Sequence, residues 1–446
     1  MSAGHYAATA IGAQLLAEGG NAADAACAMG FALQVLEPHM NGPAGEVPIL
    51  YYEAATNETH VICGQGPAPA RATREVFSDL GLDRIPGSGL LAATVPSACD
   101  AWCTLLERFG TQSFERVAAP AVKLARDGFP AYGFLRDTLL LLRKKFERAW
   151  PSSAALYVPV EKIGGRMRNP AWAATLQSLI DAEKQQSGTR EQKIRAARDV
   201  FYRGAVAEEI DAFLRSPAPD DAGRVHAGLL TADDLAAYRG GVETCVTTTY
   251  RGAIVYKCPP WSQGPVFLQQ LRLLEGFPLS EMGPGSADSL HTLIEAAKLA
   301  FADREANYGD PRAVEVPLER LLSESYNEER RRLIDPKRAS DEQRPGIGAF
   351  PEGWPWVEEG KPLPAEPQAF AAAKGRGDTT HLDAVDRSGN LVSATPSGAW
   401  IMSSPVIPAL GFPIGTRAQM FSLDPAHPNV VAPGKRPRTT LTPSLA

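Results

Sequence analysis

The sequence predicts an α+β fold: helical and strand-like patterns alternate in the first quarter of the chain, a mainly helical stretch follows, and a second hairpin is expected near the C-terminal end. Residues 113–214 are mainly helical in pattern, whereas β-hairpins are expected at residues 47–63 and 379–395. The chain has 446 residues, of which 44% are hydrophobic and 22% charged. That length and composition are sufficient for a large buried core.

Helix signals begin near the start of the chain and return through its middle. Residues 8–17 have helical apolar spacing and stop at Gly19-Gly20, because glycine readily adopts the backbone conformation that ends a helix. Asn21 is a good N-cap for an alanine-rich helix over residues 22–36. Further helices are expected over residues 114–125, 137–150, 205–213, 268–274 and 289–307 and after the cap Thr231, and a strand over residues 250–258.

The first hairpin is predicted near the N-terminus of the chain. Residues 47–52 and 59–63 are rich in residues that favour strands. Between them lies the turn-like sequence Ala55-Thr56-Asn57, so the two runs are expected to pair.

The second hairpin follows a stretch of different character. Residues from about 340 to 378 are rich in proline, glycine and charge, and cannot bury enough apolar surface to pack alone. We expect a mobile linker there. The alternating runs 379–386 and 391–395 then flank a tight turn at residues 388–390. A strand that opens abruptly at Thr379 after such a segment is where the chemistry is sought.

Charge and motif content exclude several classes of function. The net charge is -6 with a pI of about 5.8, which argues against a nucleic-acid-binding surface. No stretch is apolar enough to span a bilayer, and the first residues lack a signal-peptide pattern. His291 and Glu295 lie one helical turn apart without a third ligand within reach, so they are read as structural. We expect no metal, no cofactor and no membrane partner.

The six cysteines indicate a reducing environment. They form no Cys-x-x-Cys pair and no cysteine-histidine cluster with zinc spacing. Thiols spread through a large apolar chain are typical of reduced core residues, which predicts a cytoplasmic location.

Asp378-Thr379 is the candidate reactive bond. A hydroxyl beside a strained peptide can attack the preceding carbonyl and form an ester that water hydrolyses. The freed threonine would then carry a nucleophilic oxygen and an α-amino group, and the pKa of such a group, about 7.7–8.0, suits it to act as general base. Taken alone, the local sequence favours a threonine-rich strand that has no catalytic role over a reactive bond.

Motifs across nearly the whole chain resemble the γ-glutamyltransferase family. Thr379-Thr380-His381, with the hairpin after it, resembles the family's cleavage site, and Gly19-Gly20-Asn21 with Asp24 resembles its N-terminal signature. Other matches fall in family order: Glu37-Pro38, Ala68-Pro69, Gly128-Phe129, Leu230-Thr231, Asp233-Asp234-Leu235, Gly264, His291, Ala302-Asp303-Arg304, Gly309-Asp310-Pro311, Lys435-Arg436-Pro437 and Thr442-Pro443.

This resemblance implies a four-layer αββα sandwich of the N-terminal-nucleophile hydrolase type. It also implies that a precursor cuts itself into a large segment, residues 1–378, and a small segment, residues 379–446, which could form a heterodimer. Thr379 would be the nucleophile that forms an acyl-enzyme, and Ser397 would hydrogen-bond it. The family's substrate-binding positions fall at Gln65, Thr395, Gln419, Ser422, Thr439 and Thr440.

Several of these positions depart from the family's pattern. Gln65 stands where the family uses an arginine for the substrate α-carboxylate, and an amide cannot replace a bidentate guanidinium. Ala399 and Ser422 stand where the family has an asparagine and an aspartate. Trp400 adds an apolar group close by in the sequence, which is also compatible with core packing. We therefore expect an amide or acyl donor other than glutathione, with water or an amine as acceptor.

Two other functional readings stay open at this stage. One is true γ-glutamyl transfer with the charge supplied by Arg376, Arg417, Arg436 or Arg438, although surface or structural roles are favoured for each. The other is an uncut scaffold without chemistry. The chain ends at Ala446, before the family's glycine pair that forms the oxyanion hole, and we expect it to be truncated there.

Overall fold

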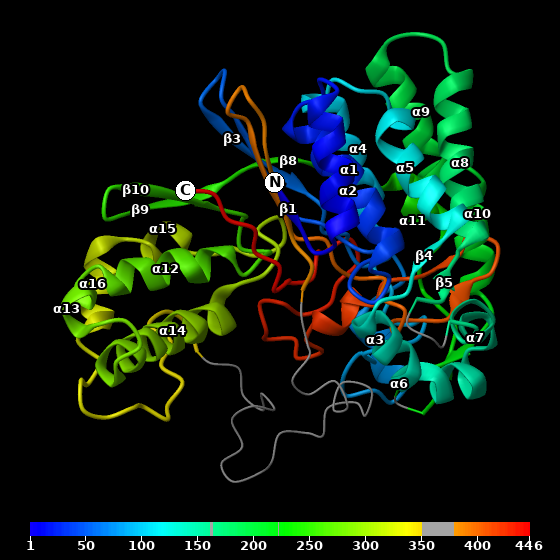
Figure 1. Cartoon of the computed structure of the whole chain (residues 1–446). Coiled ribbons are helices and arrows are strands. Elements are labelled where there is room, and N and C mark those ends of the chain that lie inside the picture. The colour runs from blue at the N-terminus through cyan, green and yellow to red at the C-terminus, as the bar shows by residue number, and fades with distance from the viewer. Residues whose placement is uncertain (161–163, 222, 350–378) are drawn as a thin grey trace.

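A six-stranded antiparallel sheet organises the fold (Figure 1). The computed structural model describes residues 1–160, 164–221, 223–349 and 379–446. Neighbouring strands in the sheet follow the order β1-β11-β12-β2-β3-β8, so the hairpin after Thr379 is inserted between strands from the first part of the chain. The strands are β1 (Ser2–Ala3), β2 (Ile49–Glu53), β3 (Glu58–Cys63), β8 (Gly241–Thr244), β11 (Leu382–Val385) and β12 (Leu391–Ala394).

Alternating residues of this sheet enter two different cores. Ile49 and Tyr51 of β2 join the large core beneath the helices, together with Ile62 of β3. Leu50 and Val61, which point the other way, join a small core with Trp261 beyond β10. A strand exposes successive side chains on opposite faces, so the sheet is covered on both sides.

The first helical layer covers one face of the sheet. In it α2 (Ala22–Leu36) packs against β11 and β12, and every residue of the helix is buried. Small side chains permit this, since a Cβ on Gly30 would overlap the ring of Trp102. The layer also contains α1 (Tyr6–Ala17), α4 (Ala98–Phe109), α5 (Phe114–Asp127), α8 (Pro170–Gln185), α9 (Arg190–Arg203) and α10 (Ala205–Leu214).

A second sheet and a second helical layer complete the order helix, sheet, sheet, helix (Figure 1). The second sheet pairs β9 (Val246–Tyr250) with β10 (Ala253–Lys257), and α12 (Gly264–Leu274) packs on it with α14 (Ala287–Asn307) behind. This is the αββα sandwich expected for an N-terminal-nucleophile hydrolase.

Shorter elements complete the described part of the chain. The helices are α3 (Arg74–Asp79), α6 (Gly133–Ala149), α7 (Pro151–Tyr157), α11 (Ala232–Ala237), α13 (Leu279–Met282), α15 (Leu318–Leu321), α16 (Glu324–Arg331) and the 3-10 helix η1 (Arg417–Met420). The strands are β4 (Phe129–Pro130), β5 (Arg166–Met167), β6 (Ala218–Pro219), β7 (Val225–His226), β13 (Val406–Ile407) and β14 (Phe412–Pro413).

Most predicted elements are confirmed, with two corrections. The strand expected over residues 250–258 contains β10 but was started too early, because Arg251 and Gly252 have positive φ and form a turn between β9 and β10. The strand expected to open at Thr379 begins instead at Leu382. Part of the expected linker, residues 340–349, makes defined contacts with α14, such as the bond from Gly346 N to Asp303. Residues 350–378 lie outside the described residues.

Candidate active site

Three predicted site residues, Thr379, Ser397 and Gln65, follow the same edge of the six-stranded sheet. Leu382, Ala394, Ile49 and Ile62 stand in one row across four adjacent strands. Three residues beyond this row, in the same direction, lie Thr379, Ser397, Glu46 and Gln65. Antiparallel pairing places all four at the same edge, although they come from distant parts of the sequence.

Thr379 is an exposed residue immediately before this edge, and its predicted cleavage partner Asp378 lies outside the described residues. Thr380, the next residue, is buried. A Cβ on Gly4 would collide with its hydroxyl and with the Glu37 carboxylate, so Thr380 is packed tightly against the start of the chain. This packing fixes the backbone directly after Thr379.

A hydroxyl-imidazole-carboxylate chain lies beside the start of β11. Nδ1 of His381 is 2.8 Å from the hydroxyl of Thr395, and Nε2 is 3.0 Å from the carboxylate of Asp383. Because the carboxylate accepts, the proton of a neutral imidazole lies on Nε2, and in that tautomer the hydroxyl of Thr395 donates to Nδ1. Burial alone would raise the pKa of Asp383, but the bond from His381 holds that pKa below its usual range. Thr395 therefore binds His381 rather than standing free.

Ser397 is held from two sides. Its backbone exchanges hydrogen bonds of 2.9 Å with the backbone of Glu46. Its Oγ accepts a hydrogen bond of 3.2 Å from Nη2 of Arg417, and Nε of Arg417 donates to the Glu46 carboxylate at 2.6 Å. The guanidinium of Arg417 lies 5.1 Å from the ring centroid of Trp400, and the indole N–H of Trp400 donates to the carbonyl of Met40. Trp400 thus forms a wall for Arg417.

Gln65 lines a cavity of about 500 Å³ at the end of β3. The residue is 1% exposed, and neither its amide nitrogen nor its amide oxygen has a hydrogen-bond partner in the described part of the chain. The cavity wall also includes Val95, Tyr238 and Arg436. A neutral, unpaired amide therefore occupies the position where the family pattern calls for a guanidinium.

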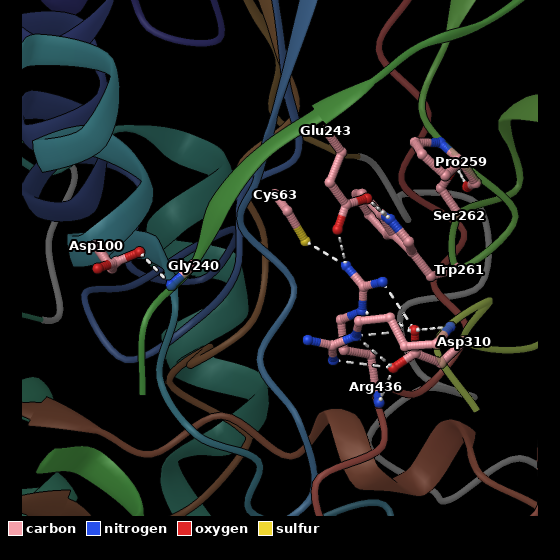
Figure 2. A network of polar contacts seen from close by, with 10 residues as sticks. Cys63, Asp100, Gly240, Glu243, Pro259, Trp261, Ser262, Asp310 and Arg436 are labelled. Carbon is pink, nitrogen blue, oxygen red and sulfur yellow. Dashed lines mark hydrogen bonds and ion pairs between the residues drawn. The ribbon is translucent and has the colours of Figure 1, made fainter. Parts of the chain in front are cut away.

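Arg436 forms the centre of a buried network beside this cavity (Figure 2). Its guanidinium donates to Asp310 at 2.8 Å and to Sγ of Cys63 at 2.8 Å, and also pairs with Glu243. Figure 2 shows these groups surrounding Arg436, with the indole of Trp261 alongside. Burial raises the pKa of the Cys63 thiol to about 11 despite the nearby cation, so the thiol is protonated and inert at neutral pH.

The remaining predicted substrate residues lie around the same loops. Thr439 is fully buried, with its N–H bonded to the carbonyl of Trp261 and its hydroxyl accepting from Leu441 N, whereas Thr440 is exposed. Ser422 accepts a hydrogen bond from the N–H of Asp424.

Gln419 lies in η1, and a Cβ on Gly87 would stand 3.0 Å from its amide oxygen. The hydroxyls of Thr439 and Ser422 thus have local hydrogen-bond partners, and the amide of Gln419 lies close to the backbone of Gly87.

Comparison with known proteins shows to which family a chain with this arrangement belongs. Residues 8–446 match the model of the family described as gamma-glutamyltranspeptidase. The chain belongs to the γ-glutamyltranspeptidase family. It is therefore an enzyme of the hydrolase and acyltransferase class that this family comprises.

The chain is similar to three known proteins over 99% of its length. It is 32% identical to the Acylase ACY 1 proenzyme of Pseudomonas sp. (strain SE83), over 99% of this chain and 73% of that protein. It is 30% identical to the Glutathione hydrolase proenzyme of Bacillus subtilis (strain 168), over 99% of this chain and 71% of that protein. The solved structure of LmbA2991HD is 46% identical, with a TM-score of 0.91 over 99% of this chain and 75% of that one.

Other sequence-based expectations can now be placed on the γ-glutamyltranspeptidase fold. All six cysteines are free, five of them buried. His291 bonds to the carbonyl of Asp335, and Glu295 pairs with Lys298 and Arg344. The described residues contain no group of three or more metal-ligating side chains and no helix both long and apolar enough to cross a membrane.

Sequence reasoning did not find the partners of several residues around the site. Arg417, Arg436 and Arg438, for which surface or structural roles were favoured, are buried, and each pairs with a carboxylate. His381, which entered the sequence prediction only as part of the Thr379-Thr380-His381 motif, bonds both Thr395 and Asp383. No local signal could have found the arginine pairs, because the partners lie more than a hundred residues away in the chain.

Proposed function

We propose that the protein is a self-cleaving amide hydrolase or acyltransferase whose nucleophile is Thr379 and whose donor is not glutathione. Membership of the γ-glutamyltranspeptidase family supports the reaction class. The position of Thr379, beside Ser397 at the edge of the central sheet, supports its assignment. The neutral amide of Gln65 in the cavity wall supports a changed donor, and is the observation that carries the proposal furthest.

Self-cleavage needs one intramolecular attack. The hydroxyl oxygen of Thr379 adds to the carbonyl carbon of Asp378, the peptide C–N bond breaks, and its nitrogen takes up a proton. Water then hydrolyses the resulting ester, which restores the hydroxyl of Thr379 and leaves its α-amine free. The cut yields segments 1–378 and 379–446 of this chain, which we propose remain together as a heterodimer.

Turnover would use the freed α-amine as the general base. The amine removes the hydroxyl proton of Thr379 while its oxygen attacks the carbonyl of a small amide donor. The proton passes to the departing amine, and water or another amine then releases the acyl group from the threonine. Each step uses side chains and backbone of this chain, so we propose no cofactor, metal, nucleic-acid or membrane partner.

The charges around the cavity support a donor that lacks the γ-glutamyl zwitterion. Arg417, Arg436 and Arg438 were candidates to replace the missing arginine, but each is already paired with a buried carboxylate. Arg376 lies outside the described residues. Arg239 and Arg312 also line the cavity, Arg312 paired with Asp310 at 3.0 Å, so the cost applies to a substrate carboxylate buried directly against the Gln65 amide and away from these cations, where it would be several kcal/mol. A donor whose acyl group is uncharged at this point avoids that cost.

True γ-glutamyl transfer is the second candidate, favoured by the similarity to a protein named glutathione hydrolase. An uncut scaffold is the third.

The free cysteines agree with the proposed cytoplasmic location.

Replacement of the nucleophile tests the proposed cut. Wild-type protein expressed from its complete reading frame should give two bands on a denaturing gel, and mass spectrometry should place Thr379 at the start of the smaller piece. Thr379→Ala should give a single band, because no hydroxyl remains to attack Asp378. Identical single bands for both proteins would reject self-cleavage and favour the scaffold.

A donor comparison tests the proposed specificity. The cut enzyme should turn over a chromogenic γ-glutamyl anilide at least a hundredfold more slowly than a matched anilide whose acyl group carries no α-carboxylate, because Gln65 offers no charge to that group. The measured quantity is kcat/KM for each anilide. Faster turnover of the γ-glutamyl compound would show that the enzyme is a true γ-glutamyltransferase.

A further inference from the structure

A closed ring of contacts surrounds Ser397 and suggests more than packing. The backbone of Ser397 is paired with that of Glu46, the carboxylate of Glu46 binds Arg417, and Arg417 donates back to the hydroxyl of Ser397. Exposure of these residues is 2% for Glu46 and 5% for both Ser397 and Arg417. The hydroxyl is therefore fixed relative to a buried guanidinium rather than free to rotate in solvent.

The backbone around this ring is packed too closely to be adjustable. A Cβ on Gly45 would collide with the carbonyl of Ser397, and one on Gly398, which has φ of +74, would collide with the Glu46 carboxylate. The ring of Trp400 lies beside the guanidinium of Arg417. An arginine held by two bonds to one carboxylate and by an aromatic wall loses little further freedom when it binds the hydroxyl. The arrangement is thus preorganised.

The direction of the Arg417 hydrogen bond sets the direction of the next one. A guanidinium can only donate, so Ser397 Oγ must accept from Arg417 and its own proton remains available to another acceptor. The nearby positive charge also makes that proton a stronger donor. The pairing of β11 with β12 ends at Leu382 and Ala394, and the same register extended by three residues would set Thr379 opposite Ser397.

We infer that Arg417, held by Glu46, is a positioning residue that makes Ser397 a hydrogen-bond donor to the side-chain oxygen of Thr379. This inference rests on the proposed function. When the Thr379 hydroxyl gives up its proton and its oxygen attacks a carbonyl, the electron pair goes into the new C–O bond, and a hydrogen bond from Ser397 holds that oxygen in the direction of attack. Without Arg417, the Ser397 hydroxyl is free to rotate, and the Thr379 oxygen loses this orientation.

A double-mutant cycle on the rate of self-cleavage tests the inference. The protein is made from its complete reading frame as wild type, Arg417→Lys, Ser397→Ala and the double variant, and the uncut fraction is followed on denaturing gels. Arg417→Lys and Ser397→Ala should each slow the cut about tenfold or more, since the hydrogen bond that orients the attacking oxygen of Thr379 is lost. The double variant should be no slower than Ser397→Ala, because Arg417 acts through that hydroxyl.

Matched controls separate positioning from stability. Arg438→Lys alters a comparable buried arginine, paired with Glu305, and should cut at the wild-type rate. Glu46→Gln keeps the shape of the site but loosens the guanidinium, and should slow the cut even if Arg417→Lys fails to fold.

Two results would overturn the inference: a rate for Arg417→Lys equal to that of Arg438→Lys, or effects that multiply in the double variant. An uncut wild type would reject the proposed function itself and the inference with it, and is recognised because every variant would then give one band.

Discussion

The buried amide of Gln65 is unusual because it has a full set of polar atoms and no partner for them in the described part of the chain. Most buried side-chain polar atoms are hydrogen-bonded, and one left unpaired costs about 1–3 kcal/mol. A folded protein that tolerates this cost at a cavity wall commonly does so for a ligand. The residue therefore supports a binding role independently of its place in the family pattern.

Replacing Gln65 with methionine should stabilise the protein. Methionine has similar length and no unpaired polar atom, so the free energy of unfolding should rise by about 1 kcal/mol. Denaturant unfolding measures the change. Gln269→Met is the matched control: Gln269 is also buried, but its amide nitrogen donates to Asp303 at 2.6 Å, so its replacement should destabilise. A loss of stability in Gln65→Met would mean that the amide has a partner after all.

Single residues were predicted well where the constraint is local. Asn21 and Thr231 form the expected N-caps, because a short polar side chain satisfies N–H groups only a few residues away. The environment of Ser397 could not be predicted, because it depends on Glu46 and Arg417, which lie far apart in the sequence. The substrate contacts of Gln419, Ser422, Thr439 and Thr440 stay predictions.

Among the elements, α2 depends on its first turn. Asn21 accepts from Asp24 N, Asp24 accepts from Asn21 N, and the Asn21 amide also donates to the carbonyl of Phe109 at 2.6 Å. The helix is buried throughout and lies against β11, the strand that follows Thr379. Its capping therefore anchors the strand that carries the candidate nucleophile.

Asn21→Ala should lower the free energy of unfolding by about 1–2 kcal/mol, because it removes the cap and the bond to Phe109. The comparison is Thr189→Ala at the start of α9, which has the same type of capping box on an exposed turn. That variant should lose about 1 kcal/mol or less. Equal losses in denaturant unfolding, or a smaller loss for Asn21→Ala, would contradict this role for the Phe109 contact.

Element boundaries were less predictable than element types. The strand expected over residues 250–258 included the turn at Arg251 and Gly252 together with β10, and it missed β9, whose sequence is mostly threonine. The sequence at residues 251–252 contains one glycine and no other strong turn signal. The start of β11 was placed three residues early for a similar reason, since β-branched Thr379 and Thr380 favour extended backbone without requiring a pairing partner.

Across the whole molecule, buried ion pairs join the two proposed segments. Arg417, Arg436 and Arg438 follow Thr379, and their partners Glu46, Asp310 and Glu305 precede it. Burial alone would raise the pKa of Asp310 and of Glu305, but the arginine contacts outweigh it and hold both below their usual range. Removing one partner of such a pair leaves a buried charge uncompensated.

Stability should therefore fall in acid. A carboxyl whose folded-state pKa is depressed stabilises the fold above its unfolded-state pKa of about 4, and that contribution is lost as pH falls toward the folded-state value. Unfolding free energy measured from pH 7 to pH 2 should decline below about pH 4.5. Asp310→Asn should be less stable at pH 7 and show a flatter decline, whereas an unchanged slope would mean that Asp310 contributes little.

The whole-molecule architecture was predicted from the family pattern rather than from local signals. The αββα order depends on strands from both ends of the chain, and periodicity alone does not pair β11 with β1 or β12 with β2. The proposed donor cavity was not predicted at all, because its wall combines residues near positions 65, 95, 238 and 436. A cavity of this kind forms only when the folded chain brings distant residues together.

The insertion of β11 and β12 between β1 and β2 has a practical outcome for anyone handling the purified material. If the chain were cut ahead of Thr379, strands β11 and β12 of the small segment would still be hydrogen-bonded between β1 and β2 of the large segment. Gel filtration or light scattering would then register one particle of unaltered mass, and dissociation would require a denaturant. The mass of the native protein therefore does not show whether the chain has been cut.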